Sequence, residues 1–158
     1  MTTLVLDVLL KPILQPRVEA WVEDWKRRQR VIRLTDKWRT NWDEKDEYDG
    51  LVGPSEIEGT EPLREELIEF RFQHHHVSKH EAAVARSLIW VLAEEWNETL
   101  DGIGAMDVRD EILNCGCKYL TTSRQRWLRR RRVYQDFEDW RRVFRQAVDE
   151  ENVDIPLP

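Results

Sequence analysis

The chain has 158 residues, of which 35% are charged and 41% are hydrophobic, and this length suffices for one domain with a hydrophobic core. Six Gly and six Pro are few for this length, which favours helices over strands and predicts an all-α domain spanning residues 1–158. The formal net charge of −6 excludes a protein that is basic throughout, so attraction to nucleic acid would have to come from local basic segments.

The sequence favours an intracellular protein. No apolar run reaches the roughly 20 residues that a membrane-spanning helix needs. Residues 1–16 lack a basic segment and a small-residue cleavage site, so we expect no signal peptide. The two cysteines are separated by one glycine, a loop too tight for a comfortable disulfide, which indicates a reducing compartment. We therefore expect a cytoplasmic or nuclear protein that is neither secreted nor membrane-spanning.

The first part of the chain has two alternative readings. Residues 4–14 are apolar and fit either a short strand or a helix, and Pro16 or Arg17 can open a helix after them. Downstream, apolar residues fall on two opposite helical faces, so the segment is either one helix held between partners or a helix that breaks. We favour a break at Thr35 and Asp36, because both are good N-cap residues.

An acidic segment and a helix follow. Residues 43–62 contain Gly and Pro and show no apolar periodicity, which predicts a flexible loop. Thr60 can cap the next helix, which should carry Leu63, Leu67 and Phe70 along one stripe.

The stretch VSKHE begins the most apolar helix of the chain. Ser78 as N-cap and Glu81 three residues later form a capping box. The following residues are apolar almost all round, which predicts the buried centre of the fold. Asp107 can cap a fourth helix, and Gly116 is expected to interrupt or bend it.

A long final helix should open at Ser123 and complete a domain of about five helices. It contains a heptad-like stripe that can dock on the domain or pair with a second copy to form a homodimer: Val133, Phe137, Trp140, Phe144 and Ala147. Residues 150–158 are expected to form an extended tail.

Histidines and cysteines cluster in a way that predicts a structural zinc site. All four histidines lie within residues 74–80, and both cysteines flank Gly116. We expect two imidazoles and two thiolates to give the tetrahedral ligand set that Zn²⁺ prefers: His76, His80, Cys115 and Cys117, with His74 or His75 as substitutes for His76. The alternative is a solvated histidine-rich helix end and buried core thiols.

These ligand types, together with the Trp-rich helical character, resemble the zinc-stabilised helical accessory proteins of lentiviruses. The eight tryptophans of the chain add to this resemblance. It implies a compact regulatory protein, viral or otherwise directed at a host.

Two basic segments point to nucleic acid. Residues 26–39 and 118–145 hold 17 of the 25 Lys and Arg residues, and these arginines lie beside Trp25 and around Trp127. Guanidinium groups suit phosphates and an indole can stack on a base, which predicts binding of nucleic acid, RNA more than DNA. The candidate residues are Arg27, Arg28, Arg30, Arg124, Arg126, Trp127, Arg129, Arg130, Arg131 and Arg132.

Two other functions remain open. The arginines can instead form a solvated face, and exposed tryptophans can serve an adaptor that captures host or partner proteins without nucleic acid. Acidic residues at Glu95, Glu98, Asp107 and Asp110 resemble the Mg²⁺-binding helices of all-α MazG-like nucleotide pyrophosphohydrolases, although D-x2-D replaces the E-x2-D of that family. Because the chain shows no phosphate loop or nucleophile motif, we expect a binding protein and not an enzyme.

Overall fold

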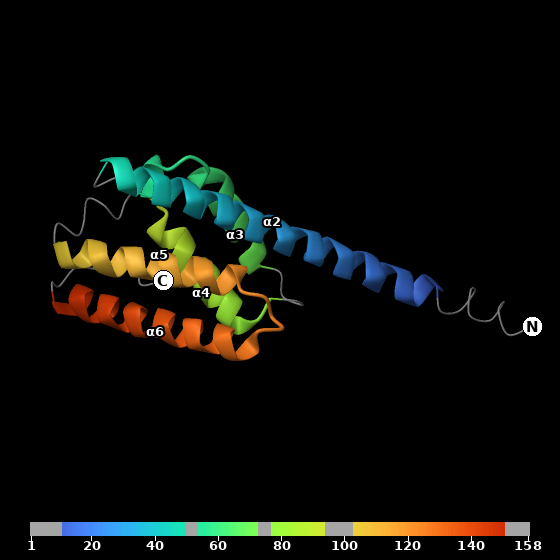
Figure 1. The fold of residues 1–158 in the computed structure, drawn as a ribbon. Helices are drawn as coiled ribbons and strands as arrows, with labels where there is room; N and C mark the ends of the chain where they lie inside the picture. Colours follow the sequence, from blue (N-terminus) through green and yellow to red (C-terminus); the bar gives the residue numbers. More distant parts are fainter. Residues whose placement is uncertain (1–10, 50–53, 73–76, 94–102, 151–158) are drawn as a thin grey trace, which may run out of the picture.

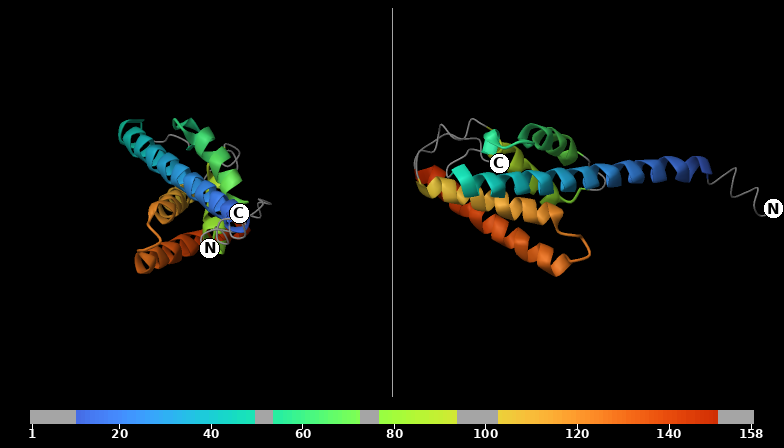
Figure 2. Two further views of the ribbon diagram at one scale, coloured as in Figure 1. Left: turned by 90° about the vertical axis from the view of Figure 1, so that its right-hand side faces the viewer. Right: turned by 45° about the horizontal axis from the view of Figure 1, so that its top comes forward.

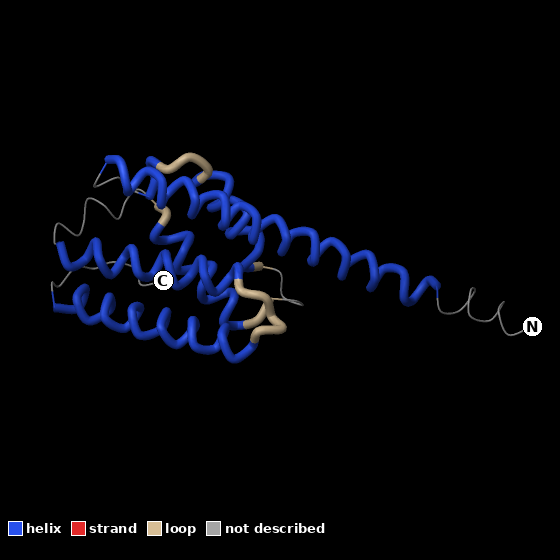
Figure 3. The backbone as a smooth tube through the Cα atoms, viewed as in Figure 1, coloured by secondary structure: helices blue, strands red, loops and turns tan. Residues whose placement is uncertain are grey.

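The computed structural model describes residues 11–49, 54–72, 77–93 and 103–150. All regular elements in these ranges are helical, which confirms the all-α fold class for the described part (Figure 3). They are five α-helices, α2 (Lys11–Asp49), α3 (Thr60–Arg71), α4 (Lys79–Val91), α5 (Ile103–Thr121) and α6 (Trp127–Glu150), and the short 3-10 helix η2 (Pro54–Glu56). None of the described helices is both long and apolar enough to cross a membrane.

The helices form a bundle from which one helix projects. α5 and α6 lie side by side, α3 and α4 pack together, and the C-terminal half of α2 lies against α3 and α5. The N-terminal half of α2 extends beyond the bundle toward the N-terminus (Figures 1 and 2). The helices contribute to one continuous core, in which Leu63, Leu88, Phe137 and Phe144 are almost fully buried.

The expected break at Thr35 and Asp36 is wrong, because α2 is a single helix of 39 residues. Val31, Thr35 and Trp38 lie on one face of α2 and are each 2% exposed or less. Burial of this face against the bundle outweighs the local capping preference of Thr35 and Asp36. α2 also includes residues 43–49, so the first part of the expected acidic loop is helical.

Other boundaries also differ from expectation. Residues 11–14 belong to α2, whereas residues 1–10 and 151–158, with the expected strand and tail, lie outside the described residues. α6 begins at Trp127, one turn after Ser123, and the residues before it form a turn in which the Arg126 amide donates to the Ser123 carbonyl.

Thr60 does not cap α3. Gly59 occupies the N-cap position with a φ of 95°, a conformation that favours glycine. The buried Thr60 hydroxyl accepts a hydrogen bond from Trp38 Nε1 at 2.7 Å and approaches the carbonyl of Pro54 at 2.6 Å. Thr60 therefore ties α2 to the connection that precedes α3.

The capping box at the start of α4 is confirmed. The Glu81 amide donates to Ser78 Oγ at 3.2 Å, and the Ser78 amide donates to Glu81 Oε2 at 2.9 Å. The heptad-like stripe of α6 turns inward, since Val133, Phe137 and Phe144 are buried within the chain. The stripe therefore serves docking on the domain, and these side chains are not available to a second copy.

Candidate nucleic-acid interface

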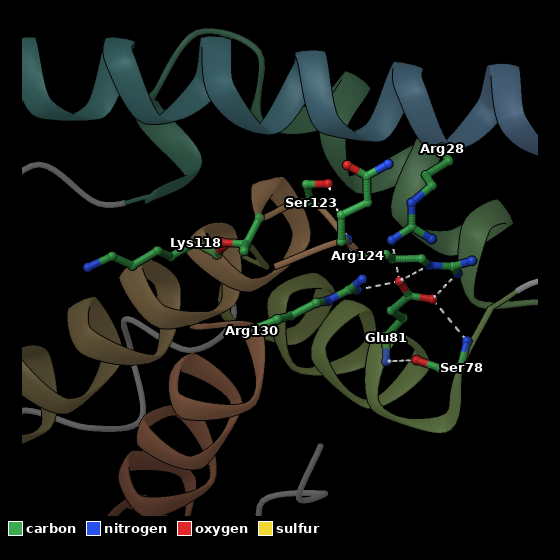
Figure 4. A network of polar contacts seen from close by, with 9 residues as sticks. Arg28, Ser78, Glu81, Lys118, Ser123, Arg124 and Arg130 are labelled. Atoms are coloured by element: carbon green, nitrogen blue, oxygen red, sulfur yellow. Dashed lines mark hydrogen bonds and ion pairs between the residues drawn. The ribbon is translucent and has the colours of Figure 1, made fainter. Parts of the chain in front are cut away.

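The functional residues expected from the sequence divide into a buried group and an exposed group. The buried group centres on Glu81, whose side chain is 0% exposed. Arg28 from α2, Arg124 from the connection before α6, and Arg130 from α6 all donate hydrogen bonds to its carboxylate (Figure 4). Arg124 contacts both carboxylate oxygens, with Nη2 at 2.7 Å from Oε2 and Nε at 3.3 Å from Oε1.

The environment of Glu81 holds its carboxylate in the charged form. Burial by itself would raise the pKa of Glu81, but hydrogen bonds from Arg28, Arg124 and the Ser78 amide, and the attraction of the Arg28 charge, hold that pKa well below its usual range. Three guanidinium groups around one carboxylate join α2, α4 and α6 in one network. Arg130 also stacks over the Tyr119 ring at 4.3 Å, which leaves its side chain 9% exposed.

This network changes the interpretation of three predicted nucleic-acid contacts. Arg28 and Arg130 have side chains only 16% and 9% exposed, so their main contacts lie inside the protein. Arg124 is half exposed, yet it also donates to Glu81. We therefore assign Arg28, Arg124 and Arg130 to the structural network first.

The remaining candidates on α2 are paired across to α3. Arg30 Nη1 lies 3.3 Å from Glu66 Oε2, and Arg27 Nη1 lies 3.9 Å from Glu69 Oε2. The two arginines are 59% and 45% exposed, so these pairs contribute little stability, but they reduce the local positive charge of α2.

The arginines on the outer face of α6 are exposed to solvent. Four arginines and an indole lie at the start of this helix, all exposed: Arg126, Arg129, Arg131, Arg132 and Trp127. Trp127 is 61% exposed. Within the described ranges, none of the four arginines has an ion pair. We call these five residues the α6 basic face.

Glu138 and Asp139, farther along α6, are held by other partners. Glu138 accepts hydrogen bonds from Tyr134 and Arg141, each at 2.8 Å. Asp139 lies 3.2 Å from Arg142. These contacts are made one or more turns beyond the α6 basic face, so they do not neutralise it directly.

The two thiols expected to bind zinc point in different directions. α5 continues without interruption through Cys115, Gly116 and Cys117, and two residues along an α-helix rotate the side chain by about 200°. Cys115 lies near Asp136 of α6, whereas Cys117 lies near Arg39 of α2. Burial raises the pKa of Cys115 to about 11 and that of Cys117 to about 12, which favours the neutral thiols.

Gly116 has a packing role that differs from the expected one. A Cβ atom at Gly116 would lie 2.8 Å from Leu88 Cδ2, so the glycine permits close approach of α4 and α5. It does not bend the helix, and it does not turn both sulfurs toward one point.

His80 also makes a contact of its own, because its ring stacks on Tyr134 with 4.2 Å between centroids. His74, His75 and His76 lie outside the described residues. Among the residues that are described, no group of three or more His, Cys, Asp or Glu side chains is arranged to hold a metal ion. The arrangement of Cys115 and Cys117 does not fit two ligands of one zinc ion.

Two of the four acidic residues expected to bind Mg²⁺ lie outside the described residues. Glu95 and Glu98 are outside the described residues, and Asp107 and Asp110 are on α5. Asp110 pairs with Arg109 Nε at 2.9 Å.

Comparison with known protein families, curated proteins and solved structures found no match to this chain. Its function must therefore be argued from its own surface.

Proposed function

We propose that the protein binds single-stranded nucleic acid, RNA in preference to DNA, through the α6 basic face. The observation that carries this proposal is the division of the arginines: Glu81 holds Arg130 inside, while Arg129, Arg131 and Arg132 remain exposed without an ion pair among the described residues. Exposed and unpaired guanidinium groups are available to phosphates without loss of an existing contact.

The exposed indole favours unpaired bases. Trp127 lies at the first residue of α6, beside Arg126, and is 61% exposed. Stacking on an aromatic side chain requires a base that is free of its own stack, as in single strands, loops and ends. Because the chain as a whole has a net charge of −6 although this face is basic, the rest of the chain would repel phosphates and confine binding to this face.

Salt dependence provides the first test. If the four arginines of the face each neutralise one phosphate, the slope of log affinity against log salt should be about −3, and affinity should fall about 50-fold between 50 and 200 mM salt. Fluorescence anisotropy of a labelled RNA strand would measure this, with DNA of the same sequence and the RNA duplex alongside. An affinity that stays flat over this range would contradict the proposal.

Substitutions provide the second test. Arg126→Gln, Arg129→Gln, Arg131→Gln and Arg132→Gln together should remove most of the salt-dependent affinity without unfolding, since all four side chains are exposed. The matched control is Arg142→Gln on the same helix, where the arginine is 69% exposed but paired with Asp139, and it should change affinity less than about twofold. Equal losses in both variants would refute a specific role for the α6 basic face.

The indole is tested separately. Trp127→Ala should weaken binding about 5- to 150-fold through loss of stacking on one base. The salt slope should not change, because no charge is removed. A variant that binds as tightly as the parent would exclude stacking by Trp127.

An adaptor that binds protein is the second candidate. The observation that favours it is a set of exposed indoles elsewhere in the molecule: Trp21 and Trp25 of α2 are 57% and 54% exposed. These residues are separate from the α6 basic face, so the four-arginine variant would retain protein binding while losing nucleic acid.

A further inference from the structure

A cleft between α2 and the connection before α6 takes no part in the contacts proposed for the α6 basic face. It encloses about 480 Å³, a volume in the range of small-molecule sites. Trp21 and Trp25 of α2 line it, and both side chains are more than half exposed. Residues 121–125 contribute polar side chains to the same cleft. The cleft therefore combines aromatic surface with groups that can hydrogen-bond.

The charged groups at the cleft are positive in sum. Arg28 and Arg124 line the cleft, and both donate to the fully buried Glu81 (Figure 4). Glu81 also holds Arg130, so three guanidinium groups share one carboxylate. Asp24 lines the cleft too, and it already has an interaction within the chain. In this described network the three arginines therefore exceed the two carboxylates by one positive charge.

The excess charge is accessible from the cleft. Arg124 binds Glu81, yet its side chain is 51% exposed, so an anion in the cleft can reach it. The state of Glu81 agrees with a positive environment, because its pKa is held well below the usual range although burial alone would raise it. Partly buried guanidinium groups bind anions more strongly than fully solvated ones do.

The cleft adjoins the α6 basic face along the chain. Arg124 and Gln125 line the cleft, and the next two residues, Arg126 and Trp127, belong to the face. A strand bound to the face would therefore pass beside the cleft.

We propose that the cleft binds a nucleoside monophosphate, with the base against Trp21 and Trp25 and the phosphate at Arg28 and Arg124. Aromatic surface alone would suit any flat apolar group, whereas the excess positive charge selects an anion that carries an aromatic ring. The neighbouring α6 basic face selects a nucleotide among such anions. The nucleotide is either free or the terminal residue of a bound strand, and the second source rests on the proposed function.

Isothermal titration calorimetry of the full chain with AMP tests the cleft. AMP should bind with a dissociation constant of about 1 mM or tighter. Adenosine and inorganic phosphate should each bind at least about tenfold more weakly, because each lacks one half of the ligand.

Substitution of the two indoles locates the bound nucleotide. Trp21→Ala with Trp25→Ala should weaken AMP binding by about tenfold or more and retain helical circular dichroism, because both side chains are exposed. The matched control is Phe72→Ala, which removes an aromatic ring that is 56% exposed and lies outside the cleft lining, and it should leave the affinity for AMP unchanged. Absence of AMP binding at about 1 mM, or an affinity that the double variant retains, would overturn the proposal.

Strand ends distinguish the two sources of the nucleotide. A linear RNA with a phosphate at its 5′ or 3′ end should bind about tenfold or more tightly than a circular RNA of the same sequence, and the double variant should lose this advantage. This result would assign the terminal nucleotide of a strand to the cleft, whereas AMP binding without it would assign a free nucleotide. If the circular RNA binds with salt dependence but AMP does not bind, the cleft proposal fails and the α6 basic face stands. If AMP binds but no RNA does, the proposed function fails and the cleft stands.

Discussion

Replacing Glu81 by Gln should strongly destabilise this protein, although the substitution removes no side-chain volume. The amide keeps the shape of the side chain and can still accept from the Ser78 amide, so the capping box survives in part. What is lost is the negative charge that Arg28, Arg124 and Arg130 share. Two of these guanidinium groups are 16% and 9% exposed, so water cannot replace the carboxylate fully.

Removal of one partner from a buried ion pair costs about 3–5 kcal/mol, a large part of the roughly 5–15 kcal/mol that stabilises a domain. For a chain of this size, the melting temperature should fall by about 6–20 °C. Urea unfolding followed by circular dichroism would measure the free energy of unfolding. Two controls isolate the charge: Ser78→Ala should cost about 0.5–2 kcal/mol through loss of the cap, and Glu58→Gln, on a side chain 84% exposed, should stay within about 0.5 kcal/mol.

The pH dependence gives an independent readout of the same group. Because the folded protein holds the pKa of Glu81 below its ordinary value of 4.5, the unfolded chain binds more protons in acid. The stabilisation is therefore complete above the unfolded pKa and is lost as the pH falls below it. The Gln variant should lack this component, and its stability should fall less steeply in acid, by up to about 1.4 kcal/mol per pH unit. A loss under about 1 kcal/mol at neutral pH, with an unchanged acid slope, would refute the reasoning.

Three further outcomes follow from the surroundings of α5. Gly116→Ala should destabilise by about 1–3 kcal/mol in urea unfolding, since its Cβ would lie 2.8 Å from the buried Leu88; a stabilised variant would refute the close approach. In the folded protein, Cys117 should react with a thiol reagent more slowly than Cys115, because burial raises the pKa to about 12 and about 11 respectively, and both should react rapidly in denaturant; fast reaction of native Cys117 would contradict its burial. Protein purified without a histidine tag should contain less than one equivalent of zinc and melt at the same temperature with chelator; one equivalent with a chelator-induced loss of stability would show that His80 and both thiols converge after all.

Local sequence signals predicted the elements that depend on neighbouring residues. The capping box of Ser78 and Glu81 involves groups three residues apart, and it forms as expected. The expected break at Thr35 and Asp36 failed because the same local preference competes with burial of a whole face of α2 against other helices. Thr60 failed as a cap for a similar reason: its hydroxyl bonds to Trp38, 22 residues away in the sequence.

The division of the arginines could not be read from the sequence for a related reason. Four consecutive arginines occupy every side of a helix, so their pattern contains no inward direction. The direction comes from the buried stripe that begins at Val133, on the same face as Arg130, and from Glu81, 49 residues before Arg130. One signal was nevertheless present: a glutamate in the first turn of the most apolar helix must lose water when that helix is buried, and it then requires cations from elsewhere in the chain.

Glu81 therefore has a consequence beyond stability. A buried ion network adds little compared with apolar packing of the same volume, but it specifies one arrangement of the helices that contribute to it. By holding Arg130 inside, Glu81 reinforces the rotation of α6 that burial of Val133 and Phe137 on the same face also requires. Residues 129, 131 and 132 are then turned by about 100° or 200° from Arg130, toward solvent, as their exposure requires. The orientation of the proposed nucleic-acid face thus depends on the buried apolar stripe of α6 together with one buried carboxylate on a different helix.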